Sequence, residues 1–524
     1  MKSVLQKIAE KTRQKEEAET DAIKAEIANP KTSNDRRNFL KKAALGGIAL
    51  GGLMHLSIED TLAQTTQKVS RASSPSDLKI TDLRVAEKGN TGYGSRIVRI
   101  YTNQGIIGIG DSRDGCDQRF VLALKSKIVG LNPCNVEMIF RVIQQFGGPG
   151  YKGAAVAAVE MACWDICGKA LGVPVWQLLG GMYRDKIRLY ADTPGGSSPE
   201  TQLANLKHRM EVQGFTWLKM DLGLTGVPGN VTNSKYWGVG QPRTNPGGPA
   251  STGPRPAPTI RVPSMESFMG YNNTEGPFTQ IQVTDKGIEE AAARIEAVRN
   301  MTGPDIPIST DHFGFLDENQ FIRLCRGIDK YRLGWLEDCF PWFYTARWKK
   351  LTDAVETPVC TGETMYGLNG VKSLETEGCF KTLIDAQAVD IVQPDLDSNG
   401  GILSTKKVGD YAELVGIPMA IHHNSSPIMF MAAVHCAAAT KNFLVLEHHN
   451  TDNEWWEGLV KKTDSQPLWE NGHANVPLTP GLGIELNDEN MKAQLTKGKT
   501  YFDVTTEWDN DDIGPNRISD KLWI

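Results

Sequence analysis

IPISTD (306–311), LGWLE (333–337) and PVCTGE (358–363) are three short, largely apolar runs that each end in a carboxylate. The carboxylates lie 26 residues apart and are Asp311, Glu337 and Glu363. One strand, one helix and two loops need about 25–30 residues, so this interval is that of a β/α unit. Because equivalent ends of successive parallel strands point to one face, we expect the three carboxylates to converge there.

The same pattern continues on both sides of these runs. Helical segments such as 286–301 and 404–415 separate the expected strands. We count eight strands, which end near Ala191, Lys219, Asp311, Glu337, Glu363, Asp395, His422 and Glu447. The predicted fold class is therefore α/β, a modified (β/α) TIM-type barrel whose chemistry lies at the carboxyl ends of the strands.

Three carboxylates that converge on one point repel one another unless a cation lies between them. Ligands that offer only oxygen favour a hard divalent ion, and Mg²⁺ is the expected cofactor. The alternative is three unrelated, solvated acids. The equal spacing and the placement at strand ends argue against that alternative.

The bulk composition is that of an ordinary globular protein. The 524 residues carry a formal net charge of −5, and the basic residues are dispersed, so a nucleic-acid partner is not expected. The nine cysteines have irregular spacing and include no C-x-x-C pair. We therefore predict neither a disulfide framework nor a zinc site, and we interpret Cys163 and Cys167 as helix packing.

The N-terminal part of the chain carries an export signal. Residues 35–41, DRRNFLK, resemble the twin-arginine motif, and an apolar stretch follows at 43–56. That stretch is short for a membrane span, so no stable membrane anchor is expected. We predict that residues 1–76 are a leader, removed or disordered, and that the mature protein is periplasmic. The alternative is a short helix with an accidental arginine pair.

The remaining chain divides into three parts. Residues 77–180 predict an α+β capping domain, and residues 181–450 predict the barrel. An insertion rich in Gly, Pro, Asn and Ser occupies residues 224–283 and is far longer than an ordinary βα loop. Residues 451–524 form a C-terminal segment and a tail, which we interpret as packing or an oligomer contact.

Several short motifs give the chain a family resemblance over roughly residues 78–490. In order they are GAAVAAVE (153–160), ACWD (162–165), GKALGVP (168–174), QLLGG (177–181), GE (362–363), QPD (393–395), GG (400–401) and PGLG (480–483). Together they resemble the enolase superfamily, in its mandelate racemase and sugar acid dehydratase (galactonate dehydratase-like) branch. The resemblance implies a cap over a modified barrel, with the C-terminal segment returning to the cap. It also implies Mg²⁺-assisted removal of the proton α to a carboxylate.

The resemblance also implies roles for individual residues. Asp311, Glu337 and Glu363 would hold Mg²⁺. His422 would be the base and Asp395 its partner, while Glu447 would lie near the reacting oxygen. His423 is adjacent to His422, and strand alternation lets only one of the two point inward; the following Ser-Pro-Ile segment favours His422.

Two departures from the family pattern bear on the reaction. Racemases of the branch carry Lys-x-Lys at the second strand, whereas this chain has Lys219 and Asp221, which favours dehydration over a two-lysine racemisation. Lys219 would bind substrate oxygens or pair with Asp221. Some aldonate dehydratases carry a catalytic His two residues after the first metal ligand, but here His312 follows Asp311 directly and Phe313 takes that place. His312 is therefore a candidate acid only if a bulge turns it inward.

The expected function is a lyase that dehydrates a sugar acid to a 2-keto-3-deoxy acid. The expected partner is a small anionic substrate, and a homo-oligomer is expected. Candidate pocket residues, which would contact the substrate, are Asp221, His423, His448 and Trp455. An epimerase, a racemase or a lactone cycloisomerase on the same site is the first alternative. A sugar-acid binding protein without catalysis is the second.

Overall fold

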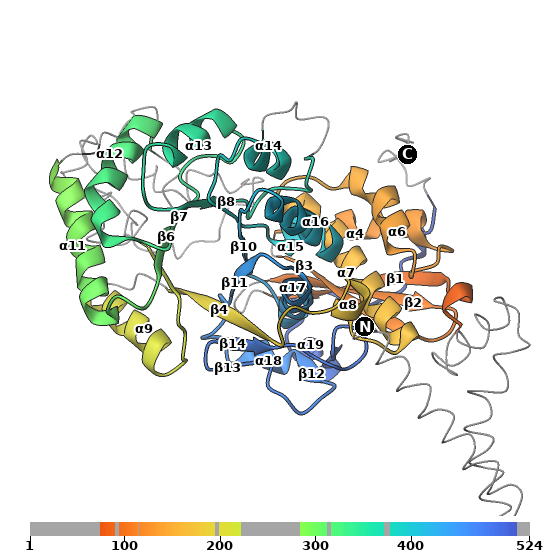
Figure 1. The fold of residues 1–524 in the computed structure, drawn as a ribbon. Helices are drawn as coiled ribbons and strands as arrows, with labels where there is room; N and C mark the ends of the chain where they lie inside the picture. Colours follow the sequence, from red (N-terminus) through yellow and green to blue (C-terminus); the bar gives the residue numbers. More distant parts are fainter. Residues whose placement is uncertain are drawn as a thin grey trace, which may run out of the picture. The chain divides into compact units, whose positions relative to one another are not determined.

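The computed structural model divides the chain into two compact units, residues 1–71 and 72–524. All residues that the structure describes belong to the second unit (Figure 1). They are residues 74–89, 94–113, 115–193, 199–221, 283, 285–311, 316–370 and 378–510. The predicted export signal, almost all of the 224–283 insertion and His312 therefore lie outside them. Across the described residues, no helix combines the length and the hydropathy of a membrane span.

The cap is an antiparallel sheet with helices on it, as predicted. Its strands, paired in the order of the sequence, are β1 (Ile80–Lys88), β2 (Ser95–Thr102) and β3 (Ile107–Ser112). The helices of the cap are α4 (Gln118–Leu122), α5 (Lys125–Ile128) and α6 (Val136–Ile143). The sequence predicts one helix over 120–129, but it breaks between α4 and α5. Lys125 follows the break and is buried between Asp82 and Asp509, at 2.7 and 2.6 Å.

A long buried helix joins the cap to the barrel. Helix α7 (Tyr151–Leu171) packs on β3 and on the short helix α15 (Leu396–Asn399) (Figure 1). It is apolar nearly all round, as a helix enclosed on every side must be. A Cβ added at Gly110 would lie 1.9 Å from the Ala158 carbonyl oxygen, so this glycine lets the helix rest directly on the sheet. Helix α8 (Val175–Leu178) follows.

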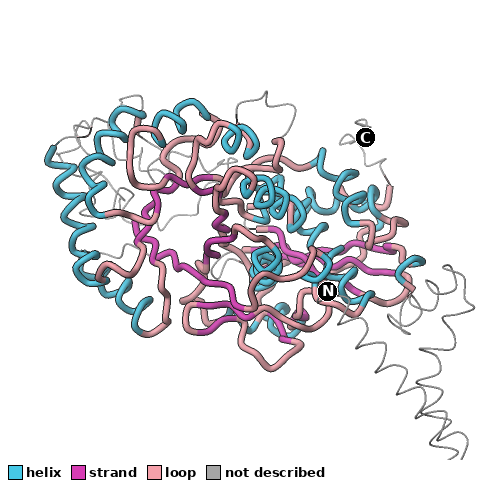
Figure 2. Tube along the Cα trace, viewed as in Figure 1, coloured by secondary structure: helices cyan, strands magenta, loops and turns pink. Residues whose placement is uncertain are grey.

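The barrel consists of eight parallel strands among the described residues. They are β4 (Lys186–Thr193), β5 (Leu218–Asp221), β6 (Ile308–Asp311), β7 (Trp335–Glu337), β8 (Val359–Thr361), β9 (Ile391–Val392), β10 (Met419–Ile421) and β11 (Phe443–Glu447). Strand β11 pairs with β4 and closes the ring, which Figure 2 shows end on. The fold prediction is confirmed.

Helices surround this ring in alternation with the strands (Figure 1). They are α9 (Pro199–Glu211), α11 (Asp285–Thr302), α12 (Glu318–Ile328), α13 (Thr345–Thr352), α14 (Phe380–Asp385), α16 (Ile402–Glu413) and α17 (Pro427–Ala439). Local sequence fixes several helix starts. The Asp317 carboxylate caps α12, and the Ser426 hydroxyl caps α17 just before a proline at the first helical position.

The C-terminal segment returns to the cap. Its elements are α18 (Trp455–Gly458), β12 (Val460–Lys462), β13 (Trp469–Glu470), β14 (His473–Asn475), β15 (Ile484–Leu486) and α19 (Asp488–Ala493). Strand β14 pairs with β4, antiparallel to it. The tail then runs along β1, where the Thr496 amide donates to the Glu87 carbonyl at 2.9 Å and Tyr501 bridges Ala86. The described tail thus packs against the cap.

Glu160 of α7 fastens that helix to the barrel. Its carboxylate accepts hydrogen bonds from the amides of Ile402 and Leu403, both at 2.8 Å, at the start of α16. Glu160→Ala leaves these two amides without a partner and is expected to lower the free energy of unfolding by about 3 kcal/mol, measured by urea denaturation. Trp164→Phe, which removes only a third donor to Glu160, is the control. Equal stability of Glu160→Ala and wild type would contradict this role.

Candidate active site

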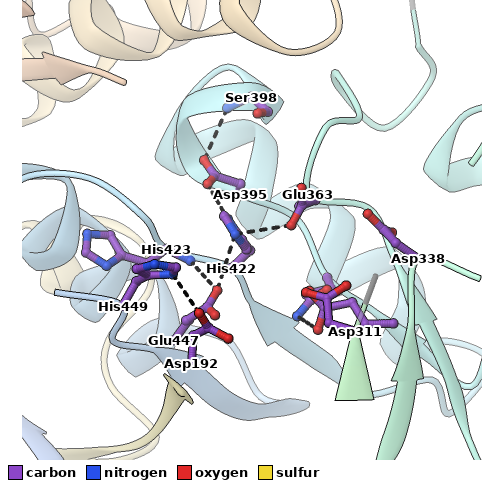
Figure 3. A network of polar contacts seen from close by, with 12 residues as sticks. Asp192, Asp311, Asp338, Glu363, Asp395, Ser398, His422, His423, Glu447 and His449 are labelled. Atoms are coloured by element: carbon purple, nitrogen blue, oxygen red, sulfur yellow. Dashed lines mark hydrogen bonds and ion pairs between the residues drawn. The ribbon is translucent and has the colours of Figure 1, made fainter. Parts of the chain in front are cut away.

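The three predicted metal ligands lie at one end of the barrel. Asp311 ends β6 and Glu337 ends β7, while Glu363 stands two residues beyond β8. Asp311 and Glu337 have side chains only 5% and 0% exposed, whereas Glu363 is 24% exposed. Glu363 contacts His422 (Figure 3), whereas Asp311 and Glu337 contact Lys219. The carboxylates therefore share one region, although they do not meet at a single point in this structure.

Lys219 of β5 occupies the space beside the two buried ligands. Its Nζ lies 3.1 Å from Asp311 Oδ2, 3.2 Å from Glu337 Oε1 and 2.9 Å from Glu447 Oε1. Burial opposes the charge of the ammonium, but the three carboxylates outweigh it and hold the pKa of Lys219 well above its usual value. Lys219 is thus a fixed cation here, bound to carboxylates across the barrel.

The donor chemistry of this region fits a hard divalent cation. Burial and the negative charge of Asp311 raise the pKa of Glu337 well above its usual value, which reflects an excess of buried negative charge. In the part of the chain that the structure describes, however, no three His, Cys, Asp or Glu side chains already stand as a metal-ion site. Ligation by the predicted triad would require the carboxylates to turn from Lys219 and His422.

The predicted base and its partner are in contact. His422 follows β10, and its Nδ1 lies 2.6 Å from Asp395 Oδ2. The other oxygen of Asp395 accepts from the amides of Asp397 and Ser398 at 2.7 and 3.2 Å, because Asp395 caps helix α15 (Figure 3). Arg113 of the cap reaches the same helix through the Ser398 hydroxyl at 3.1 Å. Helix cap and imidazole together fix the orientation of this carboxylate.

His422 faces two further carboxylates with its other nitrogen. Nε2 lies 3.1 Å from Glu363 Oε2 and 3.3 Å from Glu447 Oε2. Burial opposes protonation, but Glu363, Glu447 and Asp395 outweigh it and raise the pKa of His422 to about 10. For Asp395, burial would raise the pKa, but the hydrogen bond with His422 lowers it below its usual value. His422 is therefore protonated in this arrangement, and ligation of Mg²⁺ by Glu363 would remove one of the charges that hold this proton and so favour the neutral imidazole that a base requires.

Glu447 lies between the lysine and the dyad at the end of β11. Its side chain is 0% exposed, and burial alone would raise its pKa. The charges of Lys219 and His422 outweigh burial and lower the pKa of Glu447 to about 2. Glu447 is therefore an ionised acceptor in this structure.

Two candidate pocket histidines point away from the carboxylates. His423 and His448 are fully buried and stack with Phe430 and Trp456 behind the strands. Burial lowers the pKa of both imidazoles, to about 4 for His423, so both are neutral in this layer. The structure thus places them as packing residues that support β10 and β11.

The other sequence candidates lie in different places. Trp455 lies beneath the Lys88 ammonium of the cap, 3.6 Å from Nζ to the ring centroid. Asp221 ends β5 in register with Asp311, and its side chain lies outside the described residues, as does all of His312. The assignment of His312 as an acid remains a prediction.

Sequence reasoning missed other polar residues of the region. Asp338 is partly buried, has a positive φ of 47° and accepts a 2.6 Å hydrogen bond from the Thr361 hydroxyl. Burial and the charges of Glu363 and Asp311 raise its pKa to about 8. Gln393 donates to the Tyr190 hydroxyl at 2.8 Å and to Glu337 at 3.0 Å. The signal for Asp338 was its position next to Glu337, and the signal for Gln393 was its place as the first residue of the QPD motif.

A further histidine and acid meet where the barrel closes. His449 lies just beyond β11, and its Nδ1 is 3.5 Å from Asp192 Oδ2 on β4 (Figure 3). Nothing local in the sequence indicates this pair, because its members come from the last and the first strand of the ring.

Comparison with known proteins agrees with this architecture. The protein-family model described as mandelate racemase / muconate lactonizing enzyme, N-terminal domain, matches residues 84–180. The model described as enolase C-terminal domain-like matches residues 270–490. These matches cover the cap and most of the barrel.

Similar proteins carry related names. A D-xylonate dehydratase of Haloferax volcanii is 30% identical over 457 residues, covering 85% of this chain and 96% of that protein. A D-galactonate dehydratase family member of Streptomyces bingchenggensis is 27% identical, over 79% and 92%. The solved structure of a mandelate racemase/muconate lactonizing enzyme-like protein from Rubrobacter xylanophilus superposes with a TM-score of 0.66 at 27% identity, over 81% of this chain and 99% of that one. The chain therefore belongs to the enolase superfamily of enzymes, in its mandelate racemase/muconate lactonizing enzyme family.

Proposed function

We propose that this protein is a Mg²⁺-dependent dehydratase of an acid sugar, an aldonate or aldarate, that forms a 2-keto-3-deoxy acid and water. The observation that carries the proposal is the His422–Asp395 dyad, set beside Glu363 and Glu447 at the carboxyl end of the barrel. The dehydratase names of the relatives agree with a lyase reaction.

In this reaction His422 takes the proton from C2 of the substrate. That proton is weakly acidic because it lies α to a carboxylate, so the base must be oriented and strongly proton-attracting. Asp395 holds the imidazole by Nδ1 and leaves Nε2 directed at the site. Bound Mg²⁺, held by Asp311, Glu337 and Glu363, would supply positive charge for the developing dianion. Lys219 is a second fixed cation for the same purpose.

The state of Lys219 also bears on one form of the isomerase alternative, a racemase that uses this lysine as its second base. A racemase needs a second base on the opposite face of the substrate. While Asp311, Glu337 and Glu447 surround it, Lys219 keeps its proton and is a poor base. Binding of Mg²⁺ would turn Asp311 and Glu337 away, and Glu447, at 2.9 Å, would remain as the carboxylate that holds the ammonium. This supports dehydration over lysine-based racemisation.

The test is proton NMR of the purified, Mg²⁺-loaded protein in D₂O against aldonates, aldarates and their lactones. Loss of the C2 signal with a new deuterated C3 methylene is expected for one of them. Deuterium at C2 with the carbon skeleton and all hydroxyls retained would instead establish an epimerase or racemase. Binding with neither exchange nor turnover would establish the non-catalytic alternative.

We propose also that the protein is exported to the periplasm by the twin-arginine route. The supporting observation is the DRRNFLK sequence at 35–41 with the apolar stretch at 43–56. The double variant Arg36→Lys, Arg37→Lys is expected to stay in the cytoplasm, measured by cell fractionation and immunoblotting. Lys41→Arg, which leaves the pair intact, is the control. Equal periplasmic amounts of the double variant and wild type would contradict this route.

A further inference from the structure

We propose that His449, held by Asp192, is the acid that protonates the departing C3 hydroxyl. This inference rests on the proposed dehydration, which needs a proton donor for the leaving group. His422 is occupied with the C2 proton, and the C3 hydroxyl leaves slowly as hydroxide unless it is protonated to form water. The described part of the site offers one further imidazole in contact with an acid and partly open to solvent, and it is His449.

The closing pair of strands brings His449 and Asp192 together. Glu447 of β11 pairs in register with Tyr190 of β4, and the amide of His448 donates to the Tyr190 carbonyl at 2.8 Å. His449 lies two residues after Glu447, and Asp192 lies two residues after Tyr190. The Nδ1 atom of His449 is 3.5 Å from Asp192 Oδ2. The juxtaposition follows from strand pairing, which fixes both backbones.

Strand alternation directs Asp192 toward the mouth of the barrel. The Tyr190 side chain faces the interior, where its hydroxyl accepts from Gln393 at 2.8 Å. Asp192 lies two residues later on the same strand and therefore on the same face, one layer nearer the carboxyl end. The side chains of Asp192 and His449 are 18% and 24% exposed, so they border solvent, unlike the fully buried His448.

The two histidine–acid pairs lie on either side of Glu447. Asp395 and His422 follow β9 and β10, Glu447 ends β11, and Asp192 belongs to β4. Both His422 and His449 act electrostatically on the Glu447 carboxylate. The close-up of the site shows the three side chains in one network (Figure 3). A sugar acid bound over Glu447 would therefore face one imidazole on each side, one for C2 and one for C3.

The proposed step balances without any oxidant or reductant. His422 takes the C2 proton, and the electron pair of the C2–H bond passes into the substrate carboxylate. As the C2=C3 double bond forms, the C3–O bond breaks, and the His449 imidazolium gives its Nε2 proton to the departing oxygen to form water. The resulting enol takes up a proton at C3 and releases the proton of its C2 hydroxyl, which gives the 2-keto-3-deoxy acid. Asp192 keeps Nδ1 oriented, as carboxylates do for catalytic imidazoles.

The experiment compares C2 exchange with water loss in His449→Gln. On the sugar acid that wild type dehydrates, the variant is expected to exchange the C2 proton in D₂O within about threefold of wild type, because His422 is intact. Its dehydration rate is expected to fall by at least about a hundredfold. The 3-deoxy-3-fluoro analogue should restore elimination, because fluoride leaves without a proton. Asp192→Asn should show the same pattern with a smaller loss, and His473→Gln is the matched control.

Four results would overturn the assignment of His449 as the acid, and each leads to a different conclusion. Dehydration by His449→Gln at the wild-type rate excludes the role outright. Equal losses of exchange and dehydration, without rescue by the fluoro analogue, assign His449 to structure. The expected pattern in His312→Gln, with His449→Gln unaffected, transfers the role to His312. Absence of dehydration by wild type itself overturns the proposed function and the assignment with it, whereas the first three results leave the function standing.

Discussion

Glu363→Gln is expected to lower turnover of the sugar acid by about a thousandfold or more. The amide removes one negative charge from the predicted Mg²⁺ site, and Glu363 is the most exposed of its three carboxylates and faces His422 Nε2 at 3.1 Å. Turnover is measured at saturating Mg²⁺, and Mg²⁺ affinity by calorimetry is expected to fall together with it.

Glu356→Gln provides a matched control for this change. Glu356 is exposed and precedes β8, so its replacement alters the same charge without touching the site. Full activity of Glu363→Gln, or unchanged Mg²⁺ affinity, would contradict its assignment as a metal ligand.

His422→Asn is expected to lower both C2 exchange and dehydration by about 10³–10⁴-fold, because the variant has no base. Asparagine retains a hydrogen-bonding group near Asp395 but takes up no proton at neutral pH. Exchange is measured by NMR in D₂O, and Mg²⁺ affinity should persist. Loss of both rates in this variant would distinguish the role of His422 from that of His449, because the His449 variant is expected to lose only dehydration.

The distant His473→Asn is the control for a generic effect of replacing histidine. Asp395→Asn, which keeps the imidazole but weakens its orientation, is expected to show a smaller loss. Retention of C2 exchange in His422→Asn would contradict the assignment of the base.

Spacing along the sequence located the main chemistry of the barrel because each β/α unit repeats at nearly constant length. Asp311 and Glu337 end consecutive strands, and His422 and Asp395 are in contact across neighbouring ones. The residues at the carboxyl ends of the strands could therefore be predicted from the sequence, because local periodicity alone locates a strand end.

Contacts across the ring were not predictable in this way. Lys219 reaches from β5 to Glu337 and Glu447. The sequence offered only the substrate or the nearby Asp221 as its partner. The contact between Asp192 and His449 exists only because β11 closes on β4. Such contacts depend on closure and side-chain length, which linear spacing does not contain.

Tertiary contacts also changed local structure. The run at 120–129 has the pattern of one helix, yet it divides where Lys125 turns inward to Asp82 and Asp509. Specific ion pairs outweighed helix propensity at this point.

The tail on β1 has a consequence for the order in which the protein is completed. β1 is the edge strand of the cap, and the covering of its open edge comes from Gln494, Thr496 and Tyr501, close to the end of the chain. A ribosome makes the edge strand about 400 residues before its cover, so the edge stays open until residues 494–501 have emerged. Emergence of this segment is thus the event that allows the cap to close, and a nascent chain stalled before residue 494 would present a strand edge ready to pair with another molecule.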